Sequence, residues 1–368
     1  MISPVNIVEP TLILDSVKCR RNIRLMQEKA ARSGVTFRPH FKTHHSAEIG
    51  RWFRDRGVRK ITVSSVDMAL YFARDGWDDI TIALVFNILE TGKINKLREK
   101  VSTVNLTVDS PGTLRSLIKG LEYGVNYFIK VDTGYHRTGI LHHDTGSISE
   151  LIGLSRGSRL RFAGFLTHAG HSYRAGSVTE IRNIYTDTLG KMTALKAEFL
   201  EEFPDLEISV GDTPTISVAE SLEGADEIRP GNFVFYDLIQ LGLGSCSFDD
   251  IALVLGAPVI SKNDSRREVV VHGGAVHLSK EFITDGRGER IYGRPVRLGP
   301  DGWGELLPGS AIVSMSQEHS VIRADETLFN SVAPGDVIGI VPVHSCLAAN
   351  LAGSYLTTGG VRIPKNRY

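Results

Sequence analysis

Cysteine is scarce in this chain, with only three among 368 residues: Cys19, Cys246 and Cys346. Three widely spaced cysteines do not form a disulfide framework, so we expect a protein of a reducing compartment, the cytoplasm. The amino-terminal stretch lacks a basic segment followed by an apolar one, and an export signal is therefore not expected. Apolar runs such as "IALVLGAPVI" are too short to cross a bilayer, so the sequence predicts no membrane partner.

An excess of charge of either sign is also absent. Lys and Arg together number 42, as do Asp and Glu, so the formal net charge is zero. A neutral chain has no long-range field that would attract nucleic acid. The apolar content of 42% is that of an ordinary soluble globular protein. Composition therefore favours an enzyme that acts on a small molecule.

Short β-branched runs recur through the first two thirds of the chain, most of them separated by amphipathic stretches of helical length. The eight predicted strands cover residues 35–39, 60–65, 79–85, 105–109, 127–132, 161–167, 206–210 and 226–230. Strands that alternate with helices pair in parallel, and eight such units are the number in a closed (β/α)8 TIM-type barrel. An open doubly wound sheet is the alternative, but no G-x-G-x-x-G follows the first strand.

The sequence thus predicts an α/β protein with a barrel over residues 15–245, whose first helix is capped by Asp15. The alternation ends near residue 245, and strands punctuated by Gly and Pro follow. We expect these to form a C-terminal β-rich domain of residues 246–368 together with residues 1–14. The short strand 11–14 is expected to pair with this second domain.

Functional side chains of such a barrel gather at the carboxyl ends of its strands. Lys42, in "HFKTHH" behind the first strand, is a candidate nucleophile for a Schiff base if burial and cationic neighbours favour the neutral amine. A surface lysine at a helix start is the alternative. The glycine turns at Gly211 and Gly231, with the hydroxyl of Thr213, are candidates for a phosphate site behind strands seven and eight. No Walker motif is present, so the phosphate would belong to a cofactor.

A lysine at strand one and a phosphate site at strands seven and eight suggest pyridoxal phosphate. Six segments carry a resemblance to a known family: "RPHFKTHHS", "KVDTGYHRTGI", "GFLTHAGHSY", "SVGDTPT", "EIRPGNFVFYD" and "VPVHSCLAANL". The chain resembles the fold-type III pyridoxal-phosphate enzymes, which have an alanine-racemase-like N-terminal barrel. Within them it is most similar to the D-serine dehydratase and D-threonine aldolase group. The segments extend from residue 38 to residue 351, nearly the whole chain.

The resemblance implies roles for single residues. Lys42 would bind the cofactor covalently and then remove the α-proton of the substrate. Arg137 matches an arginine near the phenolic oxygen of the cofactor, and His168 matches a histidine that packs against the pyridine ring. The residues that would hold the cofactor or its phosphate are Tyr173, Gly211, Thr213, Gly231 and Asn232. The role of Arg229 stays open.

His344 and Cys346 stand two residues apart in "VHSCLAANL". On a strand, which we expect here, they would point to one face and could share a ligand. Imidazole and thiolate together suit zinc, although a buried cysteine beside an ordinary histidine is the alternative from spacing alone. The resemblance implies the metal site, because members of the group carry His-x-Cys or His-x-Asp here. The expected ion is Zn²⁺ or another divalent metal such as Mn²⁺.

The resemblance implies a lyase that uses pyridoxal phosphate and zinc and acts on D-3-hydroxy amino acids. Dehydration and deamination, as in D-serine dehydratase, would give a 2-keto acid and ammonia. Retro-aldol cleavage to glycine and an aldehyde, as in D-threonine aldolase, is the alternative. An amino-acid racemase would need no metal, so the His-x-Cys pair counts against it. A pyridoxal-phosphate carrier would lack the β-domain that this chain is expected to have. A homodimer is also implied. The roles of His272, His277 and His319 stay open.

Overall fold

The computed structural model describes residues 7–366, which divide into two compact units. The barrel unit comprises Arg24–Lys42 and Ile49–Gly231, and the β unit comprises residues 7–23, Thr43–Glu48 and 232–366. The predicted domain bounds stay a prediction, and their first six and last two residues lie outside the described part of the chain.

Eight parallel strands form the barrel unit, in the order β2-β10-β9-β8-β6-β5-β4-β3. Their bounds are β2 Thr36–Phe37, β3 Lys60–Val63, β4 Asp79–Val85, β5 Thr103–Val108, β6 Val125–Asp132, β8 Leu160–Leu166, β9 Glu207–Val210 and β10 Glu227–Ile228; the short β7, Ile140–Leu141, pairs with β6. A parallel bridge between His40 and Thr62 links the β2 and β3 ends of the sheet, so the barrel is nearly closed. The predicted strands and the predicted fold class are confirmed.

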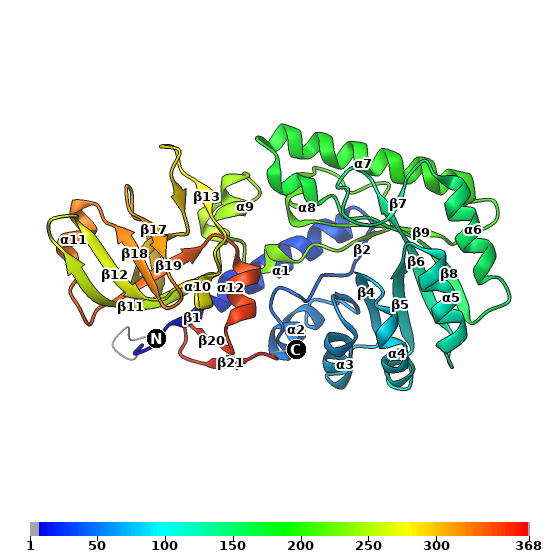
Figure 1. Ribbon diagram of the computed structural model, residues 1–368, viewed down its shortest axis with the longest axis horizontal. Coiled ribbons are helices and arrows are strands. Elements are labelled where there is room, and N and C mark those ends of the chain that lie inside the picture. The colour runs from blue at the N-terminus through cyan, green and yellow to red at the C-terminus, as the bar shows by residue number, and fades with distance from the viewer. Residues whose placement is uncertain (1–6, 367–368) are drawn as a thin grey trace. The chain divides into compact units, whose positions relative to one another are not determined.

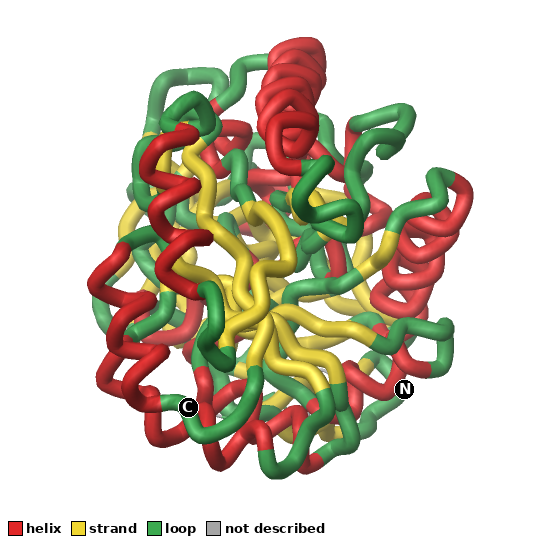
Figure 2. Tube along the Cα trace, turned by 90° about the vertical axis from the view of Figure 1, so that its right-hand side faces the viewer, coloured by secondary structure: helices red, strands yellow, loops and turns green. Residues whose placement is uncertain are grey.

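Helices surround the barrel strands, as Figure 2 shows. Their bounds are α1 Ser16–Arg32, α2 Ala47–Arg54, α3 Val66–Arg74, α4 Thr91–Arg98, α5 Pro111–Gly120, α6 Thr145–Ser155, α7 Val178–Phe199 and α8 Thr213–Val218. The Asp15 carboxylate accepts hydrogen bonds from the N–H groups of Val17 and Lys18, both at 2.9 Å, which confirms the predicted cap of α1. Each of these helices buries part of its apolar residues, such as Ile49, Trp52 and Phe53 of α2.

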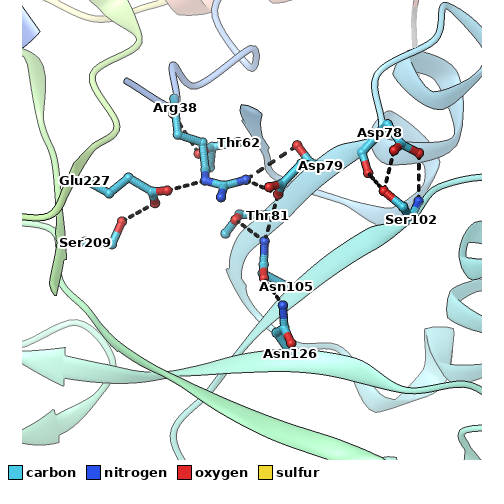
Figure 3. Close-up of polar contacts among 10 residues, drawn as sticks. All are labelled: Arg38, Thr62, Asp78, Asp79, Thr81, Ser102, Asn105, Asn126, Ser209 and Glu227. Atoms are coloured by element: carbon cyan, nitrogen blue, oxygen red, sulfur yellow. Dashed lines mark hydrogen bonds and ion pairs between the residues drawn. The ribbon is translucent and has the colours of Figure 1, made fainter. Parts of the chain in front are cut away.

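The barrel interior contains a buried ion-pair network (Figure 3). The Arg38 side chain is 2% exposed, with Nε 2.5 Å from Glu227 Oε2 and Nη1 2.5 Å from Asp79 Oδ1. Ser209 Oγ donates to the other oxygen of Glu227 at 2.5 Å, and Asn105 Nδ2 donates to Asp79 at 3.2 Å. These contacts join β4, β5, β9 and β10 to the end of β2. They satisfy buried charges that would otherwise destabilise the barrel.

We expect Arg38→Met to lower the free energy of unfolding by about 3–5 kcal/mol at neutral pH. Burial by itself raises the pKa of Glu227, but Arg38 and the Ser209 hydrogen bond outweigh it, so this pKa lies below its ordinary value. Without Arg38, burial would raise the folded-state pKa of Glu227 above the unfolded value of about 4.3. Glu227 of the folded variant would then bind a proton more readily than Glu227 of the unfolded chain. The loss of stability caused by Arg38→Met should therefore shrink as the pH falls towards 5.

Urea unfolding at pH 7 and pH 5 measures this effect. The control Arg38→Met/Glu227→Gln removes the charge that lost its partner and should recover part of the stability at pH 7. An equal, pH-independent loss in the single and double variants would contradict the ion-pair explanation.

The β unit is built on a ten-stranded sheet, in the order β16-β15-β19-β11-β1-β20-β21, with β12, β17 and β18 attached through β11. The strand bounds are β1 Thr11–Leu14, β11 Leu253–Asn263, β12 Glu268–His272, β15 Gly293–Gly299, β16 Gly302–Leu306, β17 Ala311–Met315, β18 His319–Arg323, β19 Val337–Pro342, β20 Ser354–Thr357 and β21 Arg362–Pro364, besides a small hairpin of β13 Ile283–Thr284 and β14 Arg290–Ile291. The helices of the β unit are α9 Leu238–Gly242, α10 Ala275–Leu278, α11 Glu326–Ser331 and α12 Ser345–Leu351, all labelled in Figure 1. β1 pairs with β11 and β20, which confirms that strand 11–14 joins this sheet.

Within residues 7–366, none of the helices combines the length and the apolar character needed to cross a bilayer.

Candidate active site

Lys42 lies in a turn just beyond β2, at the carboxyl end of the barrel. His40 bridges to β3, and the Lys42 N–H donates to the Nδ1 atom of His40 at 3.3 Å. The side chain of Lys42 is exposed, so the burial expected for it is not found. The reason is its place in a turn at the open mouth of the barrel, past the last residue that pairs with a neighbouring strand.

The buried lysine of this unit is Lys130, on β6. Burial is the main reason that its pKa lies well below the ordinary value, and the charges of Arg229, Arg137 and Lys42 lower this pKa further, while Asp132 opposes them. Positive charge therefore exceeds negative charge around Lys130, which suits an anionic cofactor or substrate. The sequence prediction missed this residue. Its signal was a lysine inside "VNYFIKVD", a strand otherwise typical of a barrel interior.

His168 follows β8, and its Nδ1 atom lies 2.7 Å from the carbonyl oxygen of Gly211. Because a carbonyl oxygen only accepts, Nδ1 carries the proton in this contact. Burial, followed by the charge of Lys130, holds the pKa of His168 well below its ordinary value, so the ring is neutral at pH 7. A neutral imidazole fixed by one hydrogen bond is suited to stacking on an aromatic ring.

The turn between β9 and α8 forms a backbone cradle. A Cβ atom at Gly211 would lie 2.8 Å from the backbone nitrogen of Arg229, so glycine is required for this close approach. Asp212 caps α8, accepting hydrogen bonds from the Thr215 N–H at 2.8 Å and from Ser172 Oγ at 2.9 Å. Thr213 is buried in the first turn of the helix. Backbone N–H groups at the start of a helix are a common place for a phosphate, although the Thr215 N–H is here taken by Asp212.

The other predicted cofactor residues of the barrel unit lie in loops, in a short 3₁₀ helix or at the end of the unit. Tyr173 is half-buried in the short 3₁₀ helix Gly170–Arg174, and Gly231 is the buried last residue of the unit. Arg137 is exposed, with its guanidinium 5.0 Å from the ring centre of Tyr135.

Arg229 is fully engaged inside the barrel, donating to the carbonyl oxygen of Thr167 at 2.5 Å and to Ser209. Burial lowers the pKa of Arg229 to about 10, although Glu227 opposes the shift. An anion cradle, an excess of cations and a neutral imidazole thus lie in the unit that carries Lys42. This donor set fits pyridoxal phosphate.

His344 and Cys346 do not lie on a strand, and that part of the prediction is wrong. β19 ends at Pro342, which has no N–H for the next ladder position, and His344 is the residue before α12. The Ala- and Leu-containing run "SCLAANL" favours a helix here. The two side chains nevertheless meet, since the thiol of Cys346 and the ring of His344 are hydrogen-bonded.

The contact between His344 and Cys346 favours loss of the proton from the Cys346 thiol. Burial opposes charge on both groups, but their mutual attraction outweighs it, raising the pKa of His344 to about 9 and lowering the pKa of Cys346. Thr43 Oγ1 lies 3.3 Å from the sulfur, and Asn232 Nδ2 donates to it at 3.5 Å and to the buried Asp237 at 2.6 Å. A thiolate, an imidazole and hydrogen-bonded neighbours are what a zinc site needs, so these residues fit a divalent metal.

Thr43 and Asp237 were missed from the sequence as neighbours of the metal pair. The Asn232 amide, predicted to hold the cofactor, is occupied by Asp237, Ser345 and Cys346. Its contact with the cofactor stays a prediction.

Contacts with the backbone hold His44, two residues beyond Lys42, in a structural role. His44 is fully buried, with Nδ1 accepting from the Ser46 N–H at 3.1 Å and its carbonyl oxygen accepting from Tyr355 at 2.8 Å. Neither His40, His44 nor His45 belongs to a group of three metal-ligating side chains in the described part of the chain.

A nearly closed parallel barrel with a lysine beyond its first strand and an anion cradle at β9, joined to a β-rich unit, defines the alanine-racemase-like class of pyridoxal-phosphate enzymes. Residues 14–238 match the family described as alanine racemase, N-terminal domain. Residues 252–358 match the family described as "Putative serine dehydratase domain". The chain therefore belongs to the alanine racemase N-terminal domain family.

Individual enzymes that are similar over nearly the whole chain narrow the class further. D-threo-3-hydroxyaspartate dehydratase of Delftia sp. (strain HT23) is 30% identical over 92% of this chain and 90% of its own. D-serine dehydratase of Dictyostelium discoideum is 30% identical over 94% of this chain and 91% of its own. The solved structure of the Delftia enzyme matches with a TM-score of 0.91 and 26% identity, covering 100% of both chains. The predicted family and the predicted enzyme class, a pyridoxal-phosphate-dependent lyase, are confirmed.

Proposed function

We propose that this chain dehydrates a D-3-hydroxy amino acid, giving a 2-keto acid and ammonia, with pyridoxal phosphate and a divalent metal ion. The observation that carries the proposal is the His344–Cys346 pair, whose sulfur is hydrogen-bonded by Thr43 and Asn232. A racemase has no use for such a thiolate ligand. Two relatives of nearly full coverage, named as dehydratases of D-threo-3-hydroxyaspartate and D-serine, support the same reaction.

Lys42 would take the α-proton of the substrate at Nζ, after binding the cofactor covalently in the resting enzyme. When bound, pyridoxal phosphate supplies an electron sink for the pair left at Cα. Lys42 lies at the barrel mouth, where its long side chain would serve both tasks. The residues that would hold the cofactor are Arg137, His168, Tyr173, Gly211, Thr213, Gly231 and Asn232.

His344 and Cys346 would hold the metal ion. A divalent ion supplies Lewis-acid assistance to the departing β-oxygen, since hydroxide is a poor leaving group. Two protein ligands leave positions for water and for the substrate hydroxyl, and the thiolate favours Zn²⁺ over Mn²⁺. The solved structures of the Delftia enzyme include a histidine-to-alanine mutant, and a cysteine-to-alanine mutant two positions further on that is described as metal-free. The matching His-x-Cys spacing supports the assignment.

Retro-aldol cleavage is the second candidate, because a D-threonine aldolase of Arthrobacter sp. is 26% identical over 91% of this chain. We also propose a homodimer in the cytoplasm. The cysteines Cys19, Cys246 and Cys346 are all free, which suits a reducing compartment.

Product identification tests the function. The purified protein, loaded with pyridoxal phosphate and Zn²⁺, would receive D-serine, D-threonine or D-3-hydroxyaspartate, with L-serine as the stereochemical control. We expect a keto acid and ammonia from at least one D-substrate, with loss of turnover after chelation, as measured by mass spectrometry and an ammonia assay. Glycine plus an aldehyde would instead establish the aldolase, and turnover that survives chelation would contradict both.

A further inference from the structure

A second cluster of metal-ligating side chains lies in the β unit, and the proposed reaction does not use it. His272 ends β12, His277 lies in α10, and Glu318 directly precedes β18. One ligand atom from each lies within 4.8 Å of those of the other two, and no other such group of three is found within residues 7–366. The cluster therefore shares no residue with the His344–Cys346 pair, and its ligand atoms are nitrogen and oxygen, without sulfur.

The spacing within the cluster suits a shared ion. His272 Nε2 and Glu318 Oε2 are 3.8 Å apart, longer than the roughly 3.0 Å of a hydrogen bond. Ligand atoms of a tetrahedral zinc site lie roughly 3.4 Å apart, so little adjustment is needed to bring these two atoms to an ion. The rings of His272 and His277 meet edge to face, with centroids 5.7 Å apart. All three side chains are half-buried, and binding an ion would require His277 Nδ1 to give up the hydrogen bond that it accepts from the Gly274 N–H at 3.3 Å.

The backbone beneath the cluster is tightly fixed. β12 and β18 are antiparallel neighbours, and the Gly273 N–H donates to the carbonyl oxygen of Glu318 at 2.8 Å. A Cβ atom at Gly274 would lie 2.4 Å from the carbonyl oxygen of Gln317, so only glycine allows the two segments to approach this closely. The three ligands are thus carried by two segments that are locked together, and few conformations are lost when an ion binds.

The charges in the cluster also suit a cation. Glu318 brings one negative charge, and Glu9 is close enough to act on His277.

We propose that His272, His277 and Glu318 bind a second divalent transition-metal ion, for which Zn²⁺ is the best match. Two imidazoles and a carboxylate supply three ligands of a tetrahedron and leave the fourth position to water. The ion would join the turn between β12 and α10 to the start of β18. Because the set has no thiolate, this site should release zinc more readily than the site at Cys346.

Metal content of the pyridoxal-phosphate-loaded protein tests the proposal. After loading with Zn²⁺ and gel filtration, elemental analysis should find about two zinc ions per chain in the unaltered protein and about one in Glu318→Gln. The matched control is His142→Asn/His143→Asn, which removes another edge-to-face pair of histidines, with centroids 5.0 Å apart, that lacks a third ligand. This control should keep both ions.

Calorimetric titration of Zn²⁺ into the Cys346→Ala variant then measures the second site alone. Adding Glu318→Gln or His277→Asn to that variant should weaken binding at least about 100-fold, with circular dichroism unchanged. Unchanged affinity in both combined variants would overturn the proposal, as would a single zinc ion in the unaltered protein that Cys346→Ala removes. That last outcome would leave the proposed dehydratase function intact, so the two can fail separately.

Discussion

Replacing Lys42 with alanine should lower kcat roughly 10⁴-fold or more and abolish the visible absorption of the lysine-bound cofactor. The amine is needed twice, first for covalent attachment of the cofactor and then to take the α-proton. A single substitution therefore removes two functions of one atom. Absorption spectroscopy reports the first function, and stopped assays for ammonia report the second.

A second lysine, Lys130, is also a candidate for covalent attachment of the cofactor. Lys130 is buried and its pKa lies well below the ordinary value, which are the properties expected of a nucleophilic amine, whereas Lys42 is exposed. Lys130 lies within β6, however, two residues before the end of the strand, while Lys42 lies in the turn beyond β2, where barrel enzymes keep their reactive groups. We therefore assign the covalent role to Lys42 and expect Lys130→Gln to retain the coloured, attached cofactor.

The matched control for this pair is Lys119→Ala, the same substitution at an exposed lysine of α5. It should leave both turnover and absorption unchanged. Loss of the coloured form in Lys130→Gln but not in Lys42→Ala would reverse the assignment. Loss in neither variant would exclude both lysines as the site of covalent attachment.

The barrel strands were predictable because each is a short β-branched run followed by a polar or glycine-containing turn, a pattern that local sequence fully contains. The environment of Lys130 was not, because its pKa depends on its burial inside the barrel and on Arg229, which lies far along the chain just after β10. The same is true of Arg38, whose partners Asp79 and Glu227 lie on β4 and β10. Long-range pairing of this kind has no local signal in one sequence.

The metal pair shows the opposite case. The prediction took His344 and Cys346 for strand neighbours, whereas the chain turns into α12 between them. The residue types were nevertheless sufficient to suggest the ligands, because imidazole and thiolate retain their affinity for zinc on a helix as on a strand. What spacing could not supply was Thr43, which contacts a sulfur 303 residues further along the chain.

Replacing Cys346 with alanine should lower kcat about 10³-fold, which corresponds to ~4 kcal/mol of Lewis-acid assistance, while the attached cofactor keeps its absorption. Chelation of the unaltered protein should produce the same loss. Because both treatments remove one ion, they should not add, and a chelator should have no further effect on Cys346→Ala. The measurement is kcat with and without chelator, beside metal content and the visible spectrum.

Cys246→Ser provides the matched control within the β unit. Burial raises the pKa of the Cys246 thiol, so this cysteine stays protonated and offers no thiolate to a metal ion. Its replacement should preserve both the activity and the effect of chelation. If Cys346→Ala retained turnover, the dehydration would have to proceed without the metal pair. If the variant lost its absorption together with its activity, the metal pair would have a structural role in place of an assisting one.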